Sequence, residues 1–292
     1  MHIGILSARS QRYHPNRRLM ESGSRLGHEV TLIHPGHCLS KIISGVNGFG
    51  GGLLSAGIRI LIPRIGATIN EYALSAVRHF QQAGIRVING FESILLAKNK
   101  FSCLQTLAAF GVPVPDSYLI SNVINLKKAI DALGGYPVVV KTPNGRQGAG
   151  IMLVRDRAGA EFVATNLPAH SHGLILQRFI PPGRRRDVRA FVIGEKVVGA
   201  VELKPPQGDF RANVHVGGKA SSLHIDGYLA DLAVKATKAL GLEISGTDII
   251  IDADGKAAVI EVNYSPGFRG LEACTGIDIA SQIVIHATGK EA

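Results

Sequence analysis

Short apolar runs alternate with polar segments of helical length through the first third of the chain. Apolar runs bounded by turn residues predict buried strands, and the segments between them predict helices. A β-α-β order with this spacing is typical of a small parallel sheet. Residues 45–57 are rich in glycine and predict a turn without chemistry of its own. The expected strands are 2–6, 29–33, 58–62 and 86–88. One expected helix ends near Arg25, and a second spans 71–83.

The rest of the chain, beyond a boundary near 90–100, has more strands than helices. A helix is expected over 93–110, with Ser93 as a candidate N-cap and Gly111 as its end. Residues 112–115 contain two prolines and predict an extended connector. This pattern indicates an α+β part with hairpin tips at 194–195 and 253–255. The other expected helices are 122–133 and 226–240, and the other expected strands are 138–141, 151–154, 174–177, 188–193, 196–202, 247–252 and 257–262.

The composition is that of a packed globular protein, with 46% apolar residues among 292. The cysteines, Cys38, Cys103 and Cys274, are too widely spaced for a zinc motif or a disulfide framework, which favours a reducing compartment. We find neither a signal peptide nor an apolar run of membrane-spanning length. The sequence therefore predicts a cytoplasmic protein with no membrane partner.

The net charge of +10 favours a polyanionic partner, such as nucleotide phosphates, an acidic peptide or nucleic acid. Most of the charge is dispersed, and no aromatic residues are interleaved with it, which argues against nucleic acid. The densest run is Arg184-Arg185-Arg186. It has two interpretations: a solvated loop, or a rim that attracts an acidic substrate.

A glycine-rich segment between two predicted strands begins at Lys141 and ends at Gly150. Glycines allow backbone N–H groups to turn toward a phosphate. A Walker A loop or a dinucleotide fingerprint would open a helix, and this segment does not. It therefore predicts a phosphate cover with Lys141 as a charge partner, and the alternative is an ordinary glycine-rich hairpin.

Three side chains with oxygen ligands, Asp248, Glu261 and Asn263, fall on two neighbouring strands. Glu261 and Asn263 are two residues apart and share one face of their strand. The turn at 253–255 folds the strands together and can bring Asp248 beside them. Such a set suits Mg²⁺, which takes a few carboxylates and leaves other positions to water and phosphate. The alternative is a polar, solvated strand face.

The segment 209–218 combines Arg211 and Asn213 with a pair of glycines. A mobile loop of this kind could carry Arg211 to a transferring phosphoryl group, where a guanidinium stabilises developing charge. His215 is a candidate general base, and the alternative is a structural or exposed histidine.

These pieces together resemble the ATP-grasp superfamily and, within it, the RimK-type glutamate ligases. The resemblance extends along nearly the whole chain, and the order and spacing of its motifs make it specific. The motifs are Ile62-Pro-Arg-Ile-Gly66, Ala97-Lys-Asn-Lys100, Pro137-Val-Val-Val-Lys141, Gln147-Gly-Ala-Gly150, Asp187-Val-Arg189, Gly208-Asp-Phe-Arg211-Ala-Asn213, Glu261-Val-Asn263-Tyr-Ser-Pro266-Gly267 and Thr275-Gly-Ile-Asp-Ile-Ala280.

The resemblance implies an ATP-grasp fold, with an N-terminal parallel α/β domain over 1–93 and two α+β subdomains, 94–176 and 177–292, that enclose ATP. It implies that Asp248, Glu261 and Asn263 hold two Mg²⁺ ions, with Mn²⁺ as an alternative. Substrate would meet Arg64, Arg189 and Arg269. The implied ATP ligands are Lys100, Lys141, Gly148, Gly150, the hinge residues Gln177, Arg178, Phe179 and Ile180, then Asp187, with Arg211 and Asn213 as catalytic residues at the γ-phosphate.

The implied reaction joins a carboxylate to an amine through an acyl phosphate. In RimK-type enzymes the amine is glutamate and the acceptor is the acidic C-terminus of a ribosomal protein, and the resemblance also implies a homo-oligomer. Other candidates are a ligase for a small molecule or an amino-acid carrier, and a non-catalytic nucleotide-binding regulator. The chain departs from the family pattern at Arg178, where Glu is usual, at Val216, where Arg is usual, and at Arg269, where Glu is usual.

Overall fold

The computed structural model describes residues 1–50, 57–66, 69–144, 150–166, 173–212, 218–225 and 227–289. The N-terminal part is a parallel sheet in the order β2-β1-β5-β6. Its inner strand β1 (His2–Leu6) is buried at four of its five positions, which explains the apolar run at the start of the sequence. The elements are β1 (His2–Leu6), α1 (His14–Arg25), β2 (Glu29–Ile33), β5 (Ile60–Pro63), α2 (Glu71–Gln82) and β6 (Arg86–Val87), which confirms the predicted β-α-β order.

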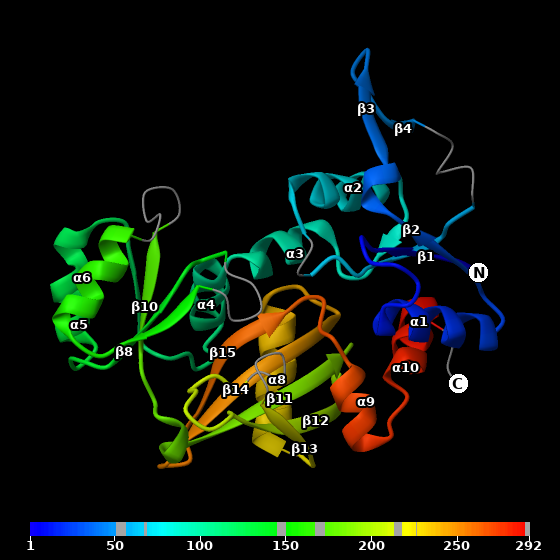
Figure 1. Ribbon diagram of the computed structural model, residues 1–292. Helices are drawn as coiled ribbons and strands as arrows, with labels where there is room; N and C mark the ends of the chain where they lie inside the picture. The colour runs from blue at the N-terminus through cyan, green and yellow to red at the C-terminus, as the bar shows by residue number, and fades with distance from the viewer. Residues whose placement is uncertain are drawn as a thin grey trace.

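A hairpin projects from this domain where a turn was predicted (Figure 1). Its strands are β3 (Leu39–Ile43) and β4 (Val46–Gly50), and they pair only with each other. The prediction of a turn over 45–57 was therefore wrong for the part that the structure describes. Glycines weaken strand propensity, and here the cross-strand ladder overrides that preference.

Two helices replace the single helix predicted over 93–110. They are α3 (Phe91–Lys98) and α4 (Lys100–Ala109). Asn99 separates them because its Oδ1 accepts hydrogen bonds from the N–H groups of Phe101 and Ser102, both at 3.0 Å. Ser93 is not an N-cap. Its hydroxyl donates to the carbonyl of Gly241 at 2.6 Å.

The second sheet is antiparallel in the order β7-β10-β8-β9. Two helices and a short 3-10 turn at Val123–Asn125 cover one face, and the other face carries Val139, Lys141 and Gln177. The helix predicted over 122–133 is thus shorter than expected. The elements are β7 (Ser117–Ile120), α5 (Leu126–Ala132), β8 (Val138–Lys141), β9 (Ile151–Val154), α6 (Arg157–Asn166) and β10 (Leu174–Arg178).

The third sheet is antiparallel and five-stranded, in the order β13-β12-β11-β14-β15. The helices α8 and α4 pack on one face, and α9 packs near the edge formed by β12 and β13. The hairpin tips at 194–195 and 253–255 are where they were predicted. The elements are β11 (Arg185–Ile193), β12 (Lys196–Lys204), β13 (Lys219–Leu223), α8 (Gly227–Ala239), β14 (Ile244–Asp252), β15 (Ala257–Asn263), α9 (Arg269–Thr275) and α10 (Ile279–Thr288).

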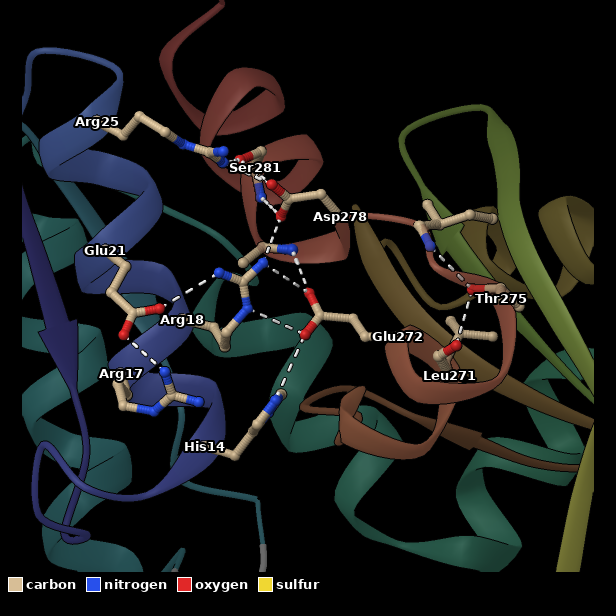
Figure 2. A network of polar contacts seen from close by, with 12 residues as sticks. His14, Arg17, Arg18, Glu21, Arg25, Leu271, Glu272, Thr275, Asp278 and Ser281 are labelled. Atoms are coloured by element: carbon tan, nitrogen blue, oxygen red, sulfur yellow. Dashed lines mark hydrogen bonds and ion pairs between the residues drawn. The ribbon is translucent and has the colours of Figure 1, made fainter.

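Polar contacts fasten the N-terminal domain to the third sheet. Asn89 is 3% exposed, and its amide donates to the carbonyls of Ile244 and Tyr264, both at 2.7 Å. Its Oδ1 accepts from the N–H groups of Glu243 and Ile244 at 2.8 and 3.0 Å. Figure 2 shows a second set of contacts, in which Arg18 of α1 reaches Glu272 of α9. The two ends of the chain therefore fold against each other.

The three sheets give the mixed α/β and α+β fold that the sequence predicted. The last strand of the second sheet, β10, runs to Arg178, so the predicted boundary at 176/177 falls within a strand. Residues of α4 belong to the core of the third sheet. The helices of the described ranges are too short or too polar to cross a bilayer.

Candidate active site

A cleft lies between the uncovered face of the second sheet and one face of the third sheet. Its volume is about 780 Å³ when the solvent at its entrance is included, a size that suits a nucleotide. Apolar side chains form much of its wall, and a few charged groups point into it. The predicted site residues that line it are Lys141, Gln177, Arg178, Ile180, Asp187, Arg211, Asp248 and Glu261.

The wall from the second sheet carries Lys141 at the end of β8. Its Nζ donates to Oε1 of Gln177 at 2.6 Å, and Nε2 of Gln177 donates to the hydroxyl of Ser117 at 2.9 Å. Burial lowers the pKa of Lys141 to about 8, although the Glu261 carboxylate opposes this shift. The ammonium is therefore mostly charged at pH 7, and an anion in the cleft would stabilise it further.

The wall from the third sheet carries three carboxylates on one face. Asp248 of β14 lies directly opposite Glu261 of β15, as the turn at 253–255 predicted. Asp187 of β11 lies opposite Ile250, two residues along β14 from Asp248, so it shares their face. The sequence alone did not show that Asp187 belongs to this set.

Basic side chains form ion pairs with two of these carboxylates. Arg189 makes a bidentate contact with Asp248, with both N–O distances 2.6 Å. Lys100 contacts Glu261 at 3.2 Å, and its backbone N–H donates to the carbonyl of Pro143 at 2.9 Å. Arg189, which the resemblance implied as a substrate ligand, therefore holds a predicted metal ligand.

Burial and these contacts shift the pKa values of Asp248 and Glu261 in opposite directions. Burial raises the pKa of Asp248, and Arg189 only partly opposes it. Burial also acts to raise the pKa of Glu261, but Lys100 and Lys141 outweigh it and leave that pKa below its usual value. Glu261 is therefore ionised at neutral pH and ready to bind a cation.

The donor set fits Mg²⁺ in type. In the ranges that the structure describes, no three His, Cys, Asp or Glu side chains gather as a metal site. Asn263 shares a face of the sheet with Asp248 and Glu261 and offers a third oxygen ligand. Its amide donates to the carbonyl of Gly246 at 3.3 Å, which leaves its Oδ1 as an oxygen ligand. Hard oxygen donors with positions left for phosphate are what Mg²⁺ requires.

The mouth of the cleft is held by Arg185, which sequence reasoning missed. Its guanidinium contacts Asp187 at 3.0 Å and donates to the carbonyls of Ile180 and Phe210, so it joins the hinge to the loop that bears Arg211. Arg211 itself pairs with Asp209 at 2.7 Å. The signal in the sequence was the run of three arginines at 184–186, which was interpreted as a solvated loop or as a rim for an acidic substrate. Neither interpretation holds for Arg185, because its side chain is only 7% exposed.

Of the other predicted residues, those that the structure describes lie outside the lining of the cleft. Phe179 packs edge-on against Phe210 at its mouth, with ring centroids 5.9 Å apart. Gly150, just before β9, accepts a hydrogen bond from the Thr142 N–H at 3.1 Å. Arg64 and Arg269 lie on the side of the N-terminal domain, near Phe268. Gly148, Asn213, His215 and Val216 lie outside the described residues.

Two antiparallel sheets that face each other across a cleft lined by Lys141, Asp248 and Glu261 have the architecture of an ATP-grasp protein. Solved structures agree with this class. A RimK domain ATP-grasp protein from Sphaerobacter thermophilus superposes with a TM-score of 0.75 at 22% identity, covering 98% of this chain and 99% of that one. D-alanine–D-alanine ligase from Bacillus anthracis, complexed with ATP, gives 0.73 at 16% identity, covering 99% and 97%. These likenesses show the fold.

The chain belongs to the RimK family. The RimK pre-ATP-grasp domain matches residues 1–94, and the RimK-like ATP-grasp domain matches 97–286. A probable alpha-L-glutamate ligase of Stenotrophomonas maltophilia is 35% identical over 287 residues, 98% of each chain. The corresponding protein of Shewanella pealeana is 34% identical over 97% of this chain, which spans only 62% of that relative's length. The resemblance drawn from the sequence is confirmed.

Proposed function

We propose that the chain is an ATP-dependent ligase that joins the amine of glutamate to the C-terminal carboxylate of an acidic protein or peptide. The observation that supports this most directly is the convergence of Lys141, Asp248 and Glu261 in one cleft between two sheets. The names of the relatives support glutamate as the amine. The net charge of +10 supports an acidic acceptor.

The reaction requires two displacements and no nucleophile from the protein. A carboxylate oxygen of the acceptor attacks the γ-phosphorus of ATP, the bond to the bridging oxygen breaks, and ADP leaves. The glutamate amine then attacks the acyl carbon, phosphate leaves with its electron pair, and the amine proton passes to solvent. The protein's part is to position these groups and to stabilise negative charge.

Several charged residues at the cleft have a part in this proposal. Lys141 and Lys100 hold phosphate oxygens, and the hinge backbone at 177–180 meets the base. Mg²⁺, held by Asp248, Glu261 and Asn263, supplies charge neutralisation at the phosphates. Arg189 keeps Asp248 oriented, and Arg185 fixes the hinge against the loop of Arg211.

A neighbour solved with a precursor peptide lends further support to a peptide acceptor. The ATP-grasp ligase PsnB, complexed with a phosphomimetic variant of a minimal precursor, Mg and ADP, superposes with a TM-score of 0.76 at 19% identity, covering 98% of this chain and 97% of that one. A ligase for a small-molecule acceptor is the second candidate, because the cleft itself does not distinguish the two.

The test is to incubate the protein with ATP, Mg²⁺ and glutamate, with and without acidic peptides, and to follow ADP by a coupled assay and adducts by mass. Glu261→Ala should abolish turnover, because it removes a carboxylate that Mg²⁺ requires. The matched control is Glu195→Ala, at an exposed hairpin tip of the same sheet. Absence of ADP under every condition would refute the ligase, glutamate on a small molecule alone would refute the peptide acceptor, and near-normal turnover of Glu261→Ala would refute the metal assignment.

A further inference from the structure

A buried guanidinium without a carboxylate partner lies outside the cleft. Arg64 follows β5 and is 6% exposed. One amino group donates to the carbonyl of Pro266 at 2.7 Å, and the guanidinium carbon lies 5.7 Å from the centre of the Phe268 ring. Its Nε is enclosed and has no hydrogen-bond partner among the described residues. Buried charges in proteins are normally paired, so this arrangement indicates a missing anion.

The Arg64 side chain keeps its charge. Burial lowers its pKa to about 10, a shift that Tyr13 opposes, so the guanidinium is protonated at neutral pH. A cation kept in this state without a counter-ion destabilises the free protein. Ionisable groups with strongly perturbed pKa values cluster at functional sites.

A second arginine adjoins Phe268 in the sequence and acts electrostatically on His14. Arg269 directly follows Phe268 and is exposed. His14 packs edge-on against Phe268, with ring centroids 5.7 Å apart. Burial lowers the pKa of His14, Glu272 opposes this, and the guanidiniums of Arg17 and Arg269 lower it further. His14 is therefore neutral near pH 7, and Arg64 and Arg269 carry the positive charge around Phe268.

The nearby carboxylates are already paired with other arginines (Figure 2). Glu272 contacts Arg18 at 3.1 Å, and Asp278 contacts Arg18 at 2.8 Å. Glu21 contacts Arg17 at 2.6 Å. Among the ion pairs of the described ranges, none includes Arg64 or Arg269. The network around α1 is thus balanced within itself and leaves these two cations for an external anion.

The position of Arg64 is one where ligands bind in α/β proteins, outside the carboxyl ends of parallel strands. Gly66 allows the chain to approach the end of β15 closely, since a Cβ at Gly66 would lie 3.2 Å from the Cβ of Ser265. Asn263 is three residues from Pro266, a span of roughly 10 Å in extended chain. The carbonyl that Arg64 contacts is therefore at most about 10 Å along the chain from the proposed metal ligand Asn263.

We propose that Arg64 and Arg269 form a carboxylate-binding site beside Phe268, which recognises the acidic substrate of the ligase. The inference rests on the proposed function for the name of that substrate, while the site itself rests on the unpaired cations. The carboxylate comes either from free glutamate or from the C-terminus of the acceptor peptide. A bidentate contact with Arg64 requires a neighbouring group to move, because Nε is enclosed.

The test compares Arg269→Gln and Arg64→Gln with Arg59→Gln. Arg59 is exposed and stands at the opposite end of β5, so its replacement changes the net charge equally and leaves the proposed site intact. Binding of glutamate, of glutamine and of a short peptide ending in glutamate is measured by calorimetry, with and without a nonhydrolysable ATP analogue. The substrate that occupies the site should bind about ten- to a hundredfold more weakly to both site variants, as expected for a lost charge-assisted contact.

The steady-state counterpart is a rise in KM for that same substrate, with KM for ATP unchanged. Weaker binding of glutamate by the site variants assigns the site to the amine donor, and weaker binding of the peptide assigns it to the acceptor. Equal binding by Arg269→Gln and the wild type overturns the proposal, even if Arg64→Gln fails to fold. A wild type that binds these ligands but forms no ADP refutes the ligase and leaves the binding comparison valid.

Discussion

Replacing Asn89 by alanine should loosen the attachment of the N-terminal domain to the third sheet. The side chain makes four hydrogen bonds to backbone groups, at 2.7, 2.7, 2.8 and 3.0 Å, and it is 3% exposed. Each such bond contributes about 1 kcal/mol net, and each buried group left without a partner costs about 1–3 kcal/mol. Water entering the space left by the side chain offsets part of this loss. We expect about 3 kcal/mol of destabilisation.

Urea denaturation followed by far-UV circular dichroism measures this effect through the shift of the midpoint. Asn89→Asp should also destabilise, because it places a second oxygen opposite the carbonyls of Ile244 and Tyr264. The matched control is Asn47→Ala, which removes a single exposed hydrogen bond to Gln82 and should change stability by less than about 0.5 kcal/mol. A loss below about 1 kcal/mol for Asn89→Ala would show that the four bonds do not act as the clamp inferred here.

Two further predictions concern Asp278 and Gly150. Burial acts to raise the pKa of Asp278, but hydrogen bonds from Arg25 and Ser281 lower it to about 2 from 3.8. Its stabilisation is therefore present above pH 3.8 and is lost as the pH falls through 2. Because the side chain is 35% exposed, Asp278→Asn should cost only about 1 kcal/mol at pH 7, and urea midpoints that differ equally at pH 2 would contradict this. Gly150 has φ +77°, and a Cβ there would lie 2.6 Å from Oγ1 of Thr142. Gly150→Ala should raise KM for ATP severalfold, because it displaces Thr142, the residue next to Lys141 of the cleft. Gly134→Ala, with φ +92° and open space, should leave KM for ATP unchanged.

Pairing within one hairpin could be predicted from the sequence. Asp248 and Glu261 meet because a short turn sets the register of two adjacent strands, and the alternation of strand faces does the rest. The irregularity after Asp248 could not be foreseen, nor could the salt bridge to Arg189, which depends on the register of strands far apart in the sequence.

A helix break, an edge strand and a buried arginine could not be identified from local sequence patterns. Asn99 is a good N-cap residue in the middle of a helical pattern, and only the cap hydrogen bonds show that the chain breaks there. The edge strand β7 is short and half exposed, so its pattern is too weak to identify without the neighbour with which it pairs. Arg185 appeared as one of three charges in a row, and its burial follows from contacts with the hinge and with Phe210.

The strand β15 carries Glu261 and Asn263 and leads directly into the segment that Arg64 and Asn89 grip. An occupant of the Phe268 site and a cation at the carboxylates would therefore act on opposite ends of one short, stiff segment. We expect their affinities to be linked: if substrate tightens the cation by a given factor, the cation must tighten substrate by the same factor. Thermodynamic reciprocity of this kind would let the protein assemble its reactants in either order and still favour the fully loaded state.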